Sequence, residues 1–514
     1  MKRLLTGFLS ALLLLSVLLL AACGGGSKDP LPHDSTAADE GDSNASGAVL
    51  PGDDTASEPG QVTFPERDYG MKPFRILCTT QCEEIYDPDP DNHETVVTGA
   101  SFRCNSLAEE TFGIELNFRA MEGRSVGRDA FSGEVRISSM DPSTTYDLII
   151  GQTYYTMAIA LEGLYFNMAS SPYIRLNENW YDKELINDNI MINNKLYAAS
   201  GDYVVSQIST MMGLYYNKTI YTNYHLEETV MEGTDLYDSV RGRTWTYEKL
   251  KEMTVSVYED EDHSGTVTSG DVFGFIGNTH APQCALIGSD TPYTERDELG
   301  DISLDNYFNA HLVDVFDTYF GFFNNEQSVY YVASDEGLIE TFCNSQALFC
   351  CHAVEYMAKE VVRGSFINYG LVPFPLYNED QTSYYTSNIR WEIANIPKSC
   401  DTERAAILFD FLNYVYCTRF TPQYFDVVLS TQVSPSEDDT EMLQLIRDCV
   451  RFDFATFYQT QLGVSYSDNI YIDVKALIRR GDTGIASWWE SNRETYRSAL
   501  VDLMDLYFYY LDEE

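Results

Sequence analysis

The chain has 514 residues, enough for several domains or two large lobes, and 44% of them are hydrophobic, which suffices to bury large cores. It carries 79 acidic against 33 basic residues, a formal net charge of −46. Because such a charge repels phosphate groups, we exclude DNA and RNA as partners and expect no electrostatic adhesion to a membrane surface.

The first 22 residues have the features of a secretory signal peptide. Lys2 and Arg3 precede an apolar run at residues 4–20, and the sequence LAAC at 20–23 is similar to a bacterial lipobox. In lipoproteins with that motif the cysteine is acylated after cleavage, so the resemblance implies that Cys23 anchors the protein on the extracellular side of the cell membrane. A transmembrane anchor is the alternative, but the apolar run is short for a span.

A spacer and then a folded region follow the predicted cleavage site. Residues 23–70 are rich in Gly, Ser, Ala, Pro and Asp, a composition typical of a disordered linker. Residues 71–514 hold ten more cysteines, among which Cys78 with Cys82 or Cys104 is the best disulfide candidate. Most of the others are interpreted as small buried hydrophobic side chains.

Predicted strands and helices alternate along the folded region. Strands are predicted at residues 74–78, 113–118 and 146–151, and helices at 101–111 and 491–510. The alternation continues to the end of the chain, which favours an α/β architecture.

Five short motifs resemble, in the same order, the extracellular solute-binding proteins of bacterial ABC importers, in particular the sugar-binding members. They are NKLYA (194–198), GLYYNK (213–218), RTWTYEKL (243–250), ETFCNSQALF (340–349) and YGLVPFP (369–375). In that family the first motif is a strand that enters the hinge and the second is a strand that leaves it. Each motif is weak alone, but five of them behind a lipobox-like start form a specific pattern.

The resemblance implies the two-lobed α/β fold of the type II periplasmic binding proteins, with a hinge and a ligand cleft between the lobes. Two general rules are consistent with such a cleft. Ligands in open α/β sheets bind beyond the carboxyl ends of strands, and two lobes can close around a solute. The predicted boundaries are 71–200 and 370–430 for lobe 1, 201–369 and 431–514 for lobe 2, and crossings near 198–206 and 368–376.

The function implied is that of a noncatalytic, monomeric receptor that captures a small solute and delivers it to a membrane permease. Aromatic residues make up 13% of the chain, and aromatic rings suit the apolar faces of sugars, so an oligosaccharide is the first candidate ligand. A cationic solute is the second candidate, because of the acidic excess, and a short peptide is the third.

Candidate ligand contacts are polar and aromatic residues next to predicted buried segments. Some follow the strand that ends at Gly151, and the resemblance implies the others, which follow the run at 347–351 or precede the segment 393–396. The candidates are Tyr154, Tyr155, Glu355, Tyr356, Arg390 and Trp391. Trp391 is the strongest single candidate. For each aromatic residue the alternative is that it packs in the core.

The sequence DEDHSGTVTSGD at 260–271 resembles an EF-hand calcium loop, with acids at its positions 1, 3 and 12 and glycine at position 6. The predicted ligands are Asp260, Asp262, Ser264, Thr266 and Asp271. Bound Ca²⁺ would stiffen this loop, and no other cofactor is expected. The alternative is a polar, solvated turn.

Two other function classes remain open. A sensor or adhesin lipoprotein could keep the same fold without a transporter. A lipid-anchored glycan hydrolase would need two carboxylates, which so acidic a chain can always offer. The sequence contains no H-E-x-x-H or G-x-x-x-x-G-K motif, and a single G-x-S-x-G match at 123–127 is a weak signal alone, so we predict a protein that is not an enzyme.

Overall fold

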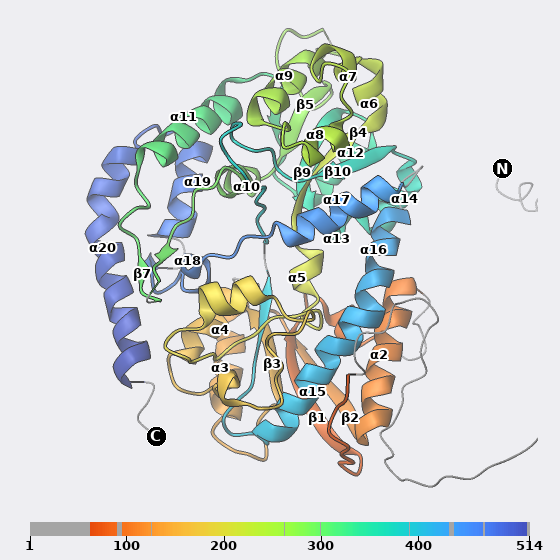
Figure 1. Ribbon diagram of the computed structural model, residues 1–514. Helices are drawn as coiled ribbons and strands as arrows, with labels where there is room; N and C mark the ends of the chain where they lie inside the picture. The colour runs from red at the N-terminus through yellow and green to blue at the C-terminus, as the bar shows by residue number, and fades with distance from the viewer. Residues whose placement is uncertain are drawn as a thin grey trace, which may run out of the picture. The chain divides into compact units, whose positions relative to one another are not determined.

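The computed structural model describes residues 62–510 (Figure 1), apart from 90–94, 125, 262, 299, 390, 431–435 and 466–467. The predicted signal peptide, Cys23 and most of the predicted spacer lie outside the described residues, as do Asp262 and Arg390. Residues 64–514 form one compact unit. Among the described helices, none is both long enough and apolar enough to cross a bilayer.

The first sheet, which defines lobe 1, brings together strands from both ends of the folded region. Its order is β11 (Glu392–Asn395), β3 (Leu148–Gln152), β1 (Lys72–Thr79) and β2 (Ile114–Met121). Strand β1 runs parallel to β2 and β3, while β11 runs antiparallel to β3. The three strands predicted near the start of the folded region are therefore confirmed.

Helices cover this sheet, as the alternating pattern predicts. Helices α2 (Val96–Phe112) and α15 (Thr402–Val415) pack against each other, and α4 (Thr153–Ala160) contacts β3, β11 and α3 (Arg128–Ser138) (Figure 1). Helix α2 ends at Gly113, whose φ of 57° is left-handed. A side chain there would also meet the Asp68 carboxylate, because a Cβ would lie 2.2 Å from its Oδ1, so glycine is required at this turn.

The second sheet, which defines lobe 2, has five strands. Its order is β10 (Tyr369–Val372), β4 (Met212–Asn217), β9 (Ala347–Ala353), β5 (Phe273–Gly277) and β8 (Val329–Tyr331). Strand β4 runs antiparallel to both of its neighbours, whereas β5 runs parallel to β8 and β9. Strands β4, β5, β9 and β10 are buried along their whole length, as expected for strands covered on both faces.

The remaining elements are short connectors in the first half of the chain and longer helices near its end. The helices are α1 (Glu83–Tyr86), α5 (Ser206–Ser209), α6 (Lys218–Asn223), α7 (Leu226–Thr229), α8 (Leu236–Arg241), α9 (Tyr247–Val257), α10 (Ala281–Gly288), α11 (Ala310–Asn325), α12 (Asp335–Cys343), α13 (Val354–Met357), α14 (Glu360–Ser365), α16 (Thr421–Ser430), α17 (Glu437–Asp448), α18 (Phe454–Phe457), α19 (Ile470–Arg480) and α20 (Ile485–Asp505). Short strand pairs and single turns complete the list: β6 (Glu295–Arg296) with β7 (Ile302–Ser303), β12 (Gly463–Ser465) with β13 (Asp468–Asn469), a 3₁₀ turn at Met168–Ser170, and π-helical turns at Leu185–Ile190, Tyr416–Phe420 and Leu506–Tyr510. Helix α20 overlaps the helix predicted at 491–510.

The structure corrects two predictions, one about a lobe boundary and one about a strand. Strand β10 pairs with β4, so the chain is still in lobe 2 at residue 370, where lobe 1 was predicted to resume, and the second crossing lies between β10 and β11. The NKLYA motif is not a strand either, since it makes one isolated bridge, at Lys195, and the next bridge falls at Ala199, just after the motif. Asn193 and Asn194 have positive φ angles, and the tight turn that they form prevents a continuous strand.

The predicted disulfide is also wrong. Cys78, Cys82 and Cys104 are free thiols and are almost completely buried. Burial raises the pKa of each of the three thiols. They therefore pack as small apolar side chains, which is the interpretation given to the other cysteines.

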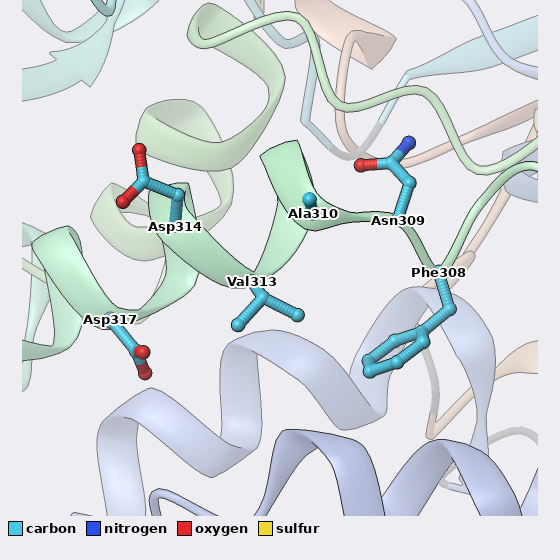
Figure 2. Close-up of a pocket in the computed structure, with 6 residues that line it drawn as sticks. All are labelled: Phe308, Asn309, Ala310, Val313, Asp314 and Asp317. Carbon is cyan, nitrogen blue, oxygen red and sulfur yellow. The ribbon is translucent and has the colours of Figure 1, made fainter.

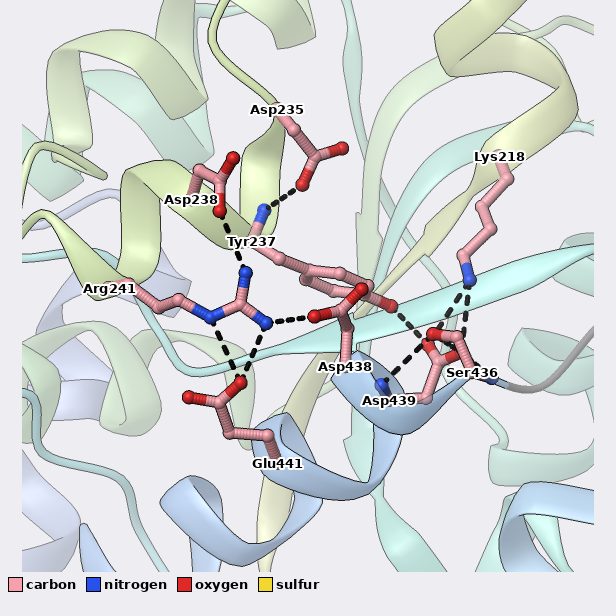
Figure 3. Close-up of polar contacts among 9 residues, drawn as sticks. All are labelled: Lys218, Asp235, Tyr237, Asp238, Arg241, Ser436, Asp438, Asp439 and Glu441. Carbon is pink, nitrogen blue, oxygen red and sulfur yellow. Dashed lines mark hydrogen bonds and ion pairs between the residues drawn. The ribbon is translucent and has the colours of Figure 1, made fainter.

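A polar cluster fixes helix α17 to lobe 2 (Figure 3). Ser436 and Asp439 form a capping box at the start of this helix. The fully buried Asp439 carboxylate also accepts hydrogen bonds from Lys218 Nζ at 3.1 Å and from the Tyr237 hydroxyl. Because Lys218 and Tyr237 lie on α6 and α8, this one carboxylate joins three helices.

Candidate functional site: a cavity between the lobes

A cavity of about 270 Å³ lies between the ends of strands from the two sheets. From lobe 1, Gln152 ends β3, and Thr153 and Tyr154 begin α4. From lobe 2, Thr279 and His280 follow the end of β5. Ligands of α/β proteins bind beyond the carboxyl ends of strands, so this cavity is the candidate binding site.

The C-terminal helices complete the wall of this cavity. The other lining residues are Ile389, Trp391, Thr456, Gln459, Tyr471, Ile472, Lys475, Ala476 and Arg479. We did not predict any contribution from α18 and α19. A sequence signal was present, because Tyr471, Lys475 and Arg479 recur every four residues and therefore share one helix face.

Two of the predicted contact residues, Tyr154 and Trp391, line the cavity together. Both side chains are only 6% exposed. The Trp391 ring packs on Phe452 and Phe457, with ring centroids 4.9 and 4.6 Å away. The rings thus form a largely buried apolar wall, and the contact of Tyr154 and Trp391 with a ligand stays a prediction.

The other predicted contacts do not line this cavity. Tyr155 is buried against Phe131 and Tyr154. Tyr356 donates a hydrogen bond of 2.7 Å to Asp335, and Glu355 is half-buried beside it on α13. Arg390 lies outside the described residues. The structure therefore separates the predicted set into two places.

Lys475 is the most unusual side chain of the cavity, because its ionisable amine is buried. It is 8% exposed, and its Nζ donates a hydrogen bond of 2.8 Å to Gln283 Oε1. The Nζ atom also lies 4.3 Å from the centroid of the Tyr471 ring. Burial lowers the pKa of Lys475 to about 7.

A second buried ionisable group, Glu392, lies where the chain enters β11. Its carboxylate accepts hydrogen bonds from the Thr79 hydroxyl and from the Tyr86 hydroxyl at 3.3 Å, and its backbone N–H donates to Ser206 Oγ at 2.8 Å. Burial raises the pKa of Glu392 to about 7. Since α5 follows the first crossing and β11 follows the second, Glu392 links both connections between the lobes.

Glu392→Gln is expected to change how stability depends on pH. Between the ordinary glutamate pKa and about 7, the folded protein keeps a proton that the unfolded chain has lost. The free energy of unfolding therefore falls as pH rises through this window, by up to about 3 kcal/mol in total. The variant should flatten this part of the stability curve, measured by urea unfolding from pH 4 to 8. Glu110→Gln, at an exposed position on α2, is the matched control, and an unchanged slope in Glu392→Gln would contradict the assignment.

The loop predicted to bind calcium is a hydrogen-bonded turn in its described part. The Asp260 carboxylate accepts the backbone N–H groups of Ser264 and Gly265 at 3.1 and 2.8 Å. The fully buried Asp271 carboxylate accepts the backbone N–H of Thr268 at 2.8 Å. Among the residues that the structure describes here, which exclude Asp262, no group of three His, Cys, Asp or Glu side chains is placed to hold a metal ion.

Calcium binding by this loop stays a prediction with a direct test. If the loop binds Ca²⁺, adding the ion should raise the melting temperature relative to a chelator, because a ligand that binds only the folded state stabilises it. The double variant Asp260→Ala and Asp262→Ala should abolish this difference. Stabilisation that persists in the double variant would place the ion elsewhere, and no stabilisation of the unmodified protein would leave a solvated turn.

A larger hollow of about 500 Å³ lies at the start of α11 (Figure 2). It is lined by Phe308, Asn309, Ala310, Val313, Asp314 and Asp317. Most of these side chains are exposed, and they come from a single helix and the loop before it. This hollow is open to solvent and is not built from strand ends, so we do not assign the binding site to it.

Comparison with known proteins identifies the fold. No protein-family model and no curated protein sequence matches the chain. Solved structures do match. This chain is similar to a cyclo/maltodextrin-binding protein complexed with maltotetraose. The TM-score is 0.52 at 11% identity, and the match covers 86% of this chain and 99% of that one.

Two further structures agree with this match. The maltose-maltodextrin binding protein of Alicyclobacillus acidocaldarius gives a TM-score of 0.51 at 13% identity, covering 84% of this chain and 100% of that one. UgpB from Mycobacterium tuberculosis, in complex with glycerophosphocholine, gives 0.51 at 11% identity, covering 84% and 99%. The chain therefore has the fold of the type II periplasmic binding proteins, to which the solute-binding proteins of ABC importers belong.

Proposed function

We propose that this protein is a noncatalytic receptor that captures a small saccharide in the cavity between its lobes and delivers it to an ABC permease. The observation that carries the proposal is the cavity itself. It lies at the ends of strands from both sheets, and both lobes contribute to its wall. A solute that contacts both lobes at once would stabilise the closed arrangement.

The lining chemistry favours a saccharide. Tyr154, Tyr471 and Trp391 offer aromatic surface, and Gln152, Gln459 and the threonines offer hydrogen-bonding groups. Sugars present apolar C–H faces and polar edges, which this mixture matches. Because pockets for small molecules usually enclose 300–1,000 Å³, a volume of about 270 Å³ suits a short saccharide better than a long chain.

The composition of the lining argues against two alternatives. Of the lining residues that the structure describes, none is Asp or Glu. A retaining or inverting glycan hydrolase needs two carboxylates at the reacting bond, and a cationic solute needs an anionic partner. The cavity offers neither, so the hydrolase and the cationic solute are disfavoured at this site.

The membrane anchor is part of the same proposal. The lipobox-like sequence before Cys23 supports acylation of that cysteine and display of the protein on the extracellular side of the membrane. Cells fed an alkynyl fatty acid should label the unmodified protein and should not label the Cys23→Ala variant. Equal labelling of both would exclude Cys23 as the anchor.

Thermal unfolding of the mature chain against a panel of mono- and disaccharides tests the receptor itself. A ligand at about one hundred times its dissociation constant should add about 2.7 kcal/mol to the free energy of unfolding. Binding without turnover of the sugar would support a receptor, whereas turnover would indicate the hydrolase. If no saccharide shifts the transition, the sensor or adhesin class becomes the better candidate.

A further inference from the structure

The charge of the cavity is opposite to the charge of the chain. The protein carries 79 acidic residues and a formal net charge of −46. The described lining of the cavity nevertheless holds Lys475, Arg479 and His280 and no carboxylate. Since sugar hydroxyl groups donate hydrogen bonds as well as accept them, a site for a neutral sugar gains from carboxylate acceptors. Their absence from the described lining indicates that the captured saccharide is not a simple neutral sugar.

Lys475 provides the strongest part of this argument. Buried charges in proteins are normally paired with an opposite charge, because desolvation of a lone ion is costly. Within the described part of the chain, Lys475 forms no ion pair, and its ammonium group donates a hydrogen bond to the neutral side chain of Gln283. An ammonium group has three N–H donors, so this hydrogen bond leaves donors for a ligand.

Neighbouring side chains hold Lys475 in place. Gln283 is 1% exposed, and its Nε2 donates to Ser387 Oγ at 3.1 Å and to the Tyr471 hydroxyl. These two hydrogen bonds orient the amide, so that its Oε1 accepts from Lys475. The lysine is therefore a fixed part of the cavity wall and not a mobile surface side chain.

Arg479 extends the positive face toward solvent. It lies four residues after Lys475 on α19, and its side chain is exposed. Residues at this spacing lie next to each other on a helix. An exposed guanidinium beside the cavity favours the entry of an anion against the negative field of the whole chain.

From this arrangement we infer that the captured saccharide carries a carboxylate, as a uronic-acid disaccharide does, and that Lys475 pairs with that carboxylate. The inference rests on the proposed receptor function. A single buried ammonium matches a single negative charge, and the net charge of the chain opposes ligands with several charges. A carboxylate therefore fits the site better than a phosphate.

Matched ligands provide the test. Binding to the mature chain is measured by calorimetry for galacturonosyl-galactose, which carries one carboxylate, and for its neutral counterpart galactobiose, in which a CH₂OH group replaces that carboxylate. Glucuronate-containing disaccharides and their neutral counterparts form a second pair, and glucose 6-phosphate is the phosphate probe. We expect at least one uronate to bind about tenfold or more tightly than its neutral counterpart, as a charge-assisted hydrogen bond provides.

Variants then assign the preference to Lys475. Lys475→Met should reduce the preference for the uronate to about threefold or less. It should fold, because it replaces a buried charge with an apolar side chain of similar length. If Lys475→Met does not fold, Lys475→Gln replaces it as the test variant. Lys183→Met, at an exposed position outside the cavity lining, is the matched control and should keep the full preference.

The outcomes separate this inference from the proposed function. Neutral disaccharides that bind as tightly as uronates would overturn the carboxylate and leave the sugar receptor intact. A preference that survives in Lys475→Met would overturn the role of Lys475, and tighter binding of glucose 6-phosphate would overturn the choice of carboxylate. If no saccharide of any class binds, the receptor function itself fails, and the inference fails with it.

Discussion

Replacing Trp391 with alanine should lower the free energy of unfolding by about 3–5 kcal/mol and should also weaken binding of the solute. The ring is 6% exposed and packs on Phe452 and Phe457, so its removal leaves a void in a close-packed wall. The same ring lines the candidate cavity. Urea unfolding of the ligand-free protein and calorimetric titration of the bound sugar measure the two effects separately.

Two further variants show which effect dominates. Trp391→Phe keeps part of the packing and should recover much of the lost stability while binding remains weak. Trp488→Ala removes a tryptophan that is only half-buried on α20 and should cost less stability. If Trp391→Ala weakens binding at unchanged stability, the ring serves the ligand alone and its contacts with the two phenylalanines contribute little.

Asp439→Ala is expected to destabilise the protein by about 3–5 kcal/mol, the usual result of removing one partner from a buried ion pair. The carboxylate is fully buried and accepts hydrogen bonds from Lys218, Tyr237 and Ser436 (Figure 3). Its loss leaves these donors without an acceptor and removes the capping box of α17. Chemical denaturation at neutral pH measures the difference.

The adjacent residue supplies the control. Asp438 pairs with Arg241, but its side chain is 50% exposed, and exposed ion pairs contribute at most about 1 kcal/mol. Asp438→Ala should therefore change stability far less than Asp439→Ala. Equal effects would mean that the negative charge near the start of α17 matters and that the buried contacts of Asp439 do not.

Much of the fold could be predicted from the sequence, because several strands are apolar runs or alternate between apolar and polar residues. The segments that became β1 and β3 are apolar enough to show where strands lie, whereas β4 was expected from the resemblance of its GLYYNK motif. Which sheet a strand joins is less visible. Strand β10 is buried along its whole length, which does not distinguish the two sheets, and only its pairing with β4 assigns it to lobe 2.

The candidate site could be predicted only where it lies next to a strand in the sequence. Tyr154 comes directly after β3, and Trp391 comes directly before β11, so rules about strand ends locate both. Lys475 lies on a helix far from either sheet in the sequence, and its partner Gln283 belongs to α10. Nothing in the local pattern around residue 475 shows that tertiary packing brings these two side chains together.

The order of the strands has a consequence for how quickly the chain can fold. Strand β3 needs β11 as its outer neighbour, yet all five strands of the second sheet lie between these two strands in the sequence. The first sheet therefore cannot be completed from one contiguous stretch, whereas the second sheet can. Folding rates fall as contacting residues lie farther apart in the sequence, so native structure should form late and slowly. A chain exported through its predicted signal peptide would then stay unfolded for longer, which favours passage through a secretion channel as extended polypeptide.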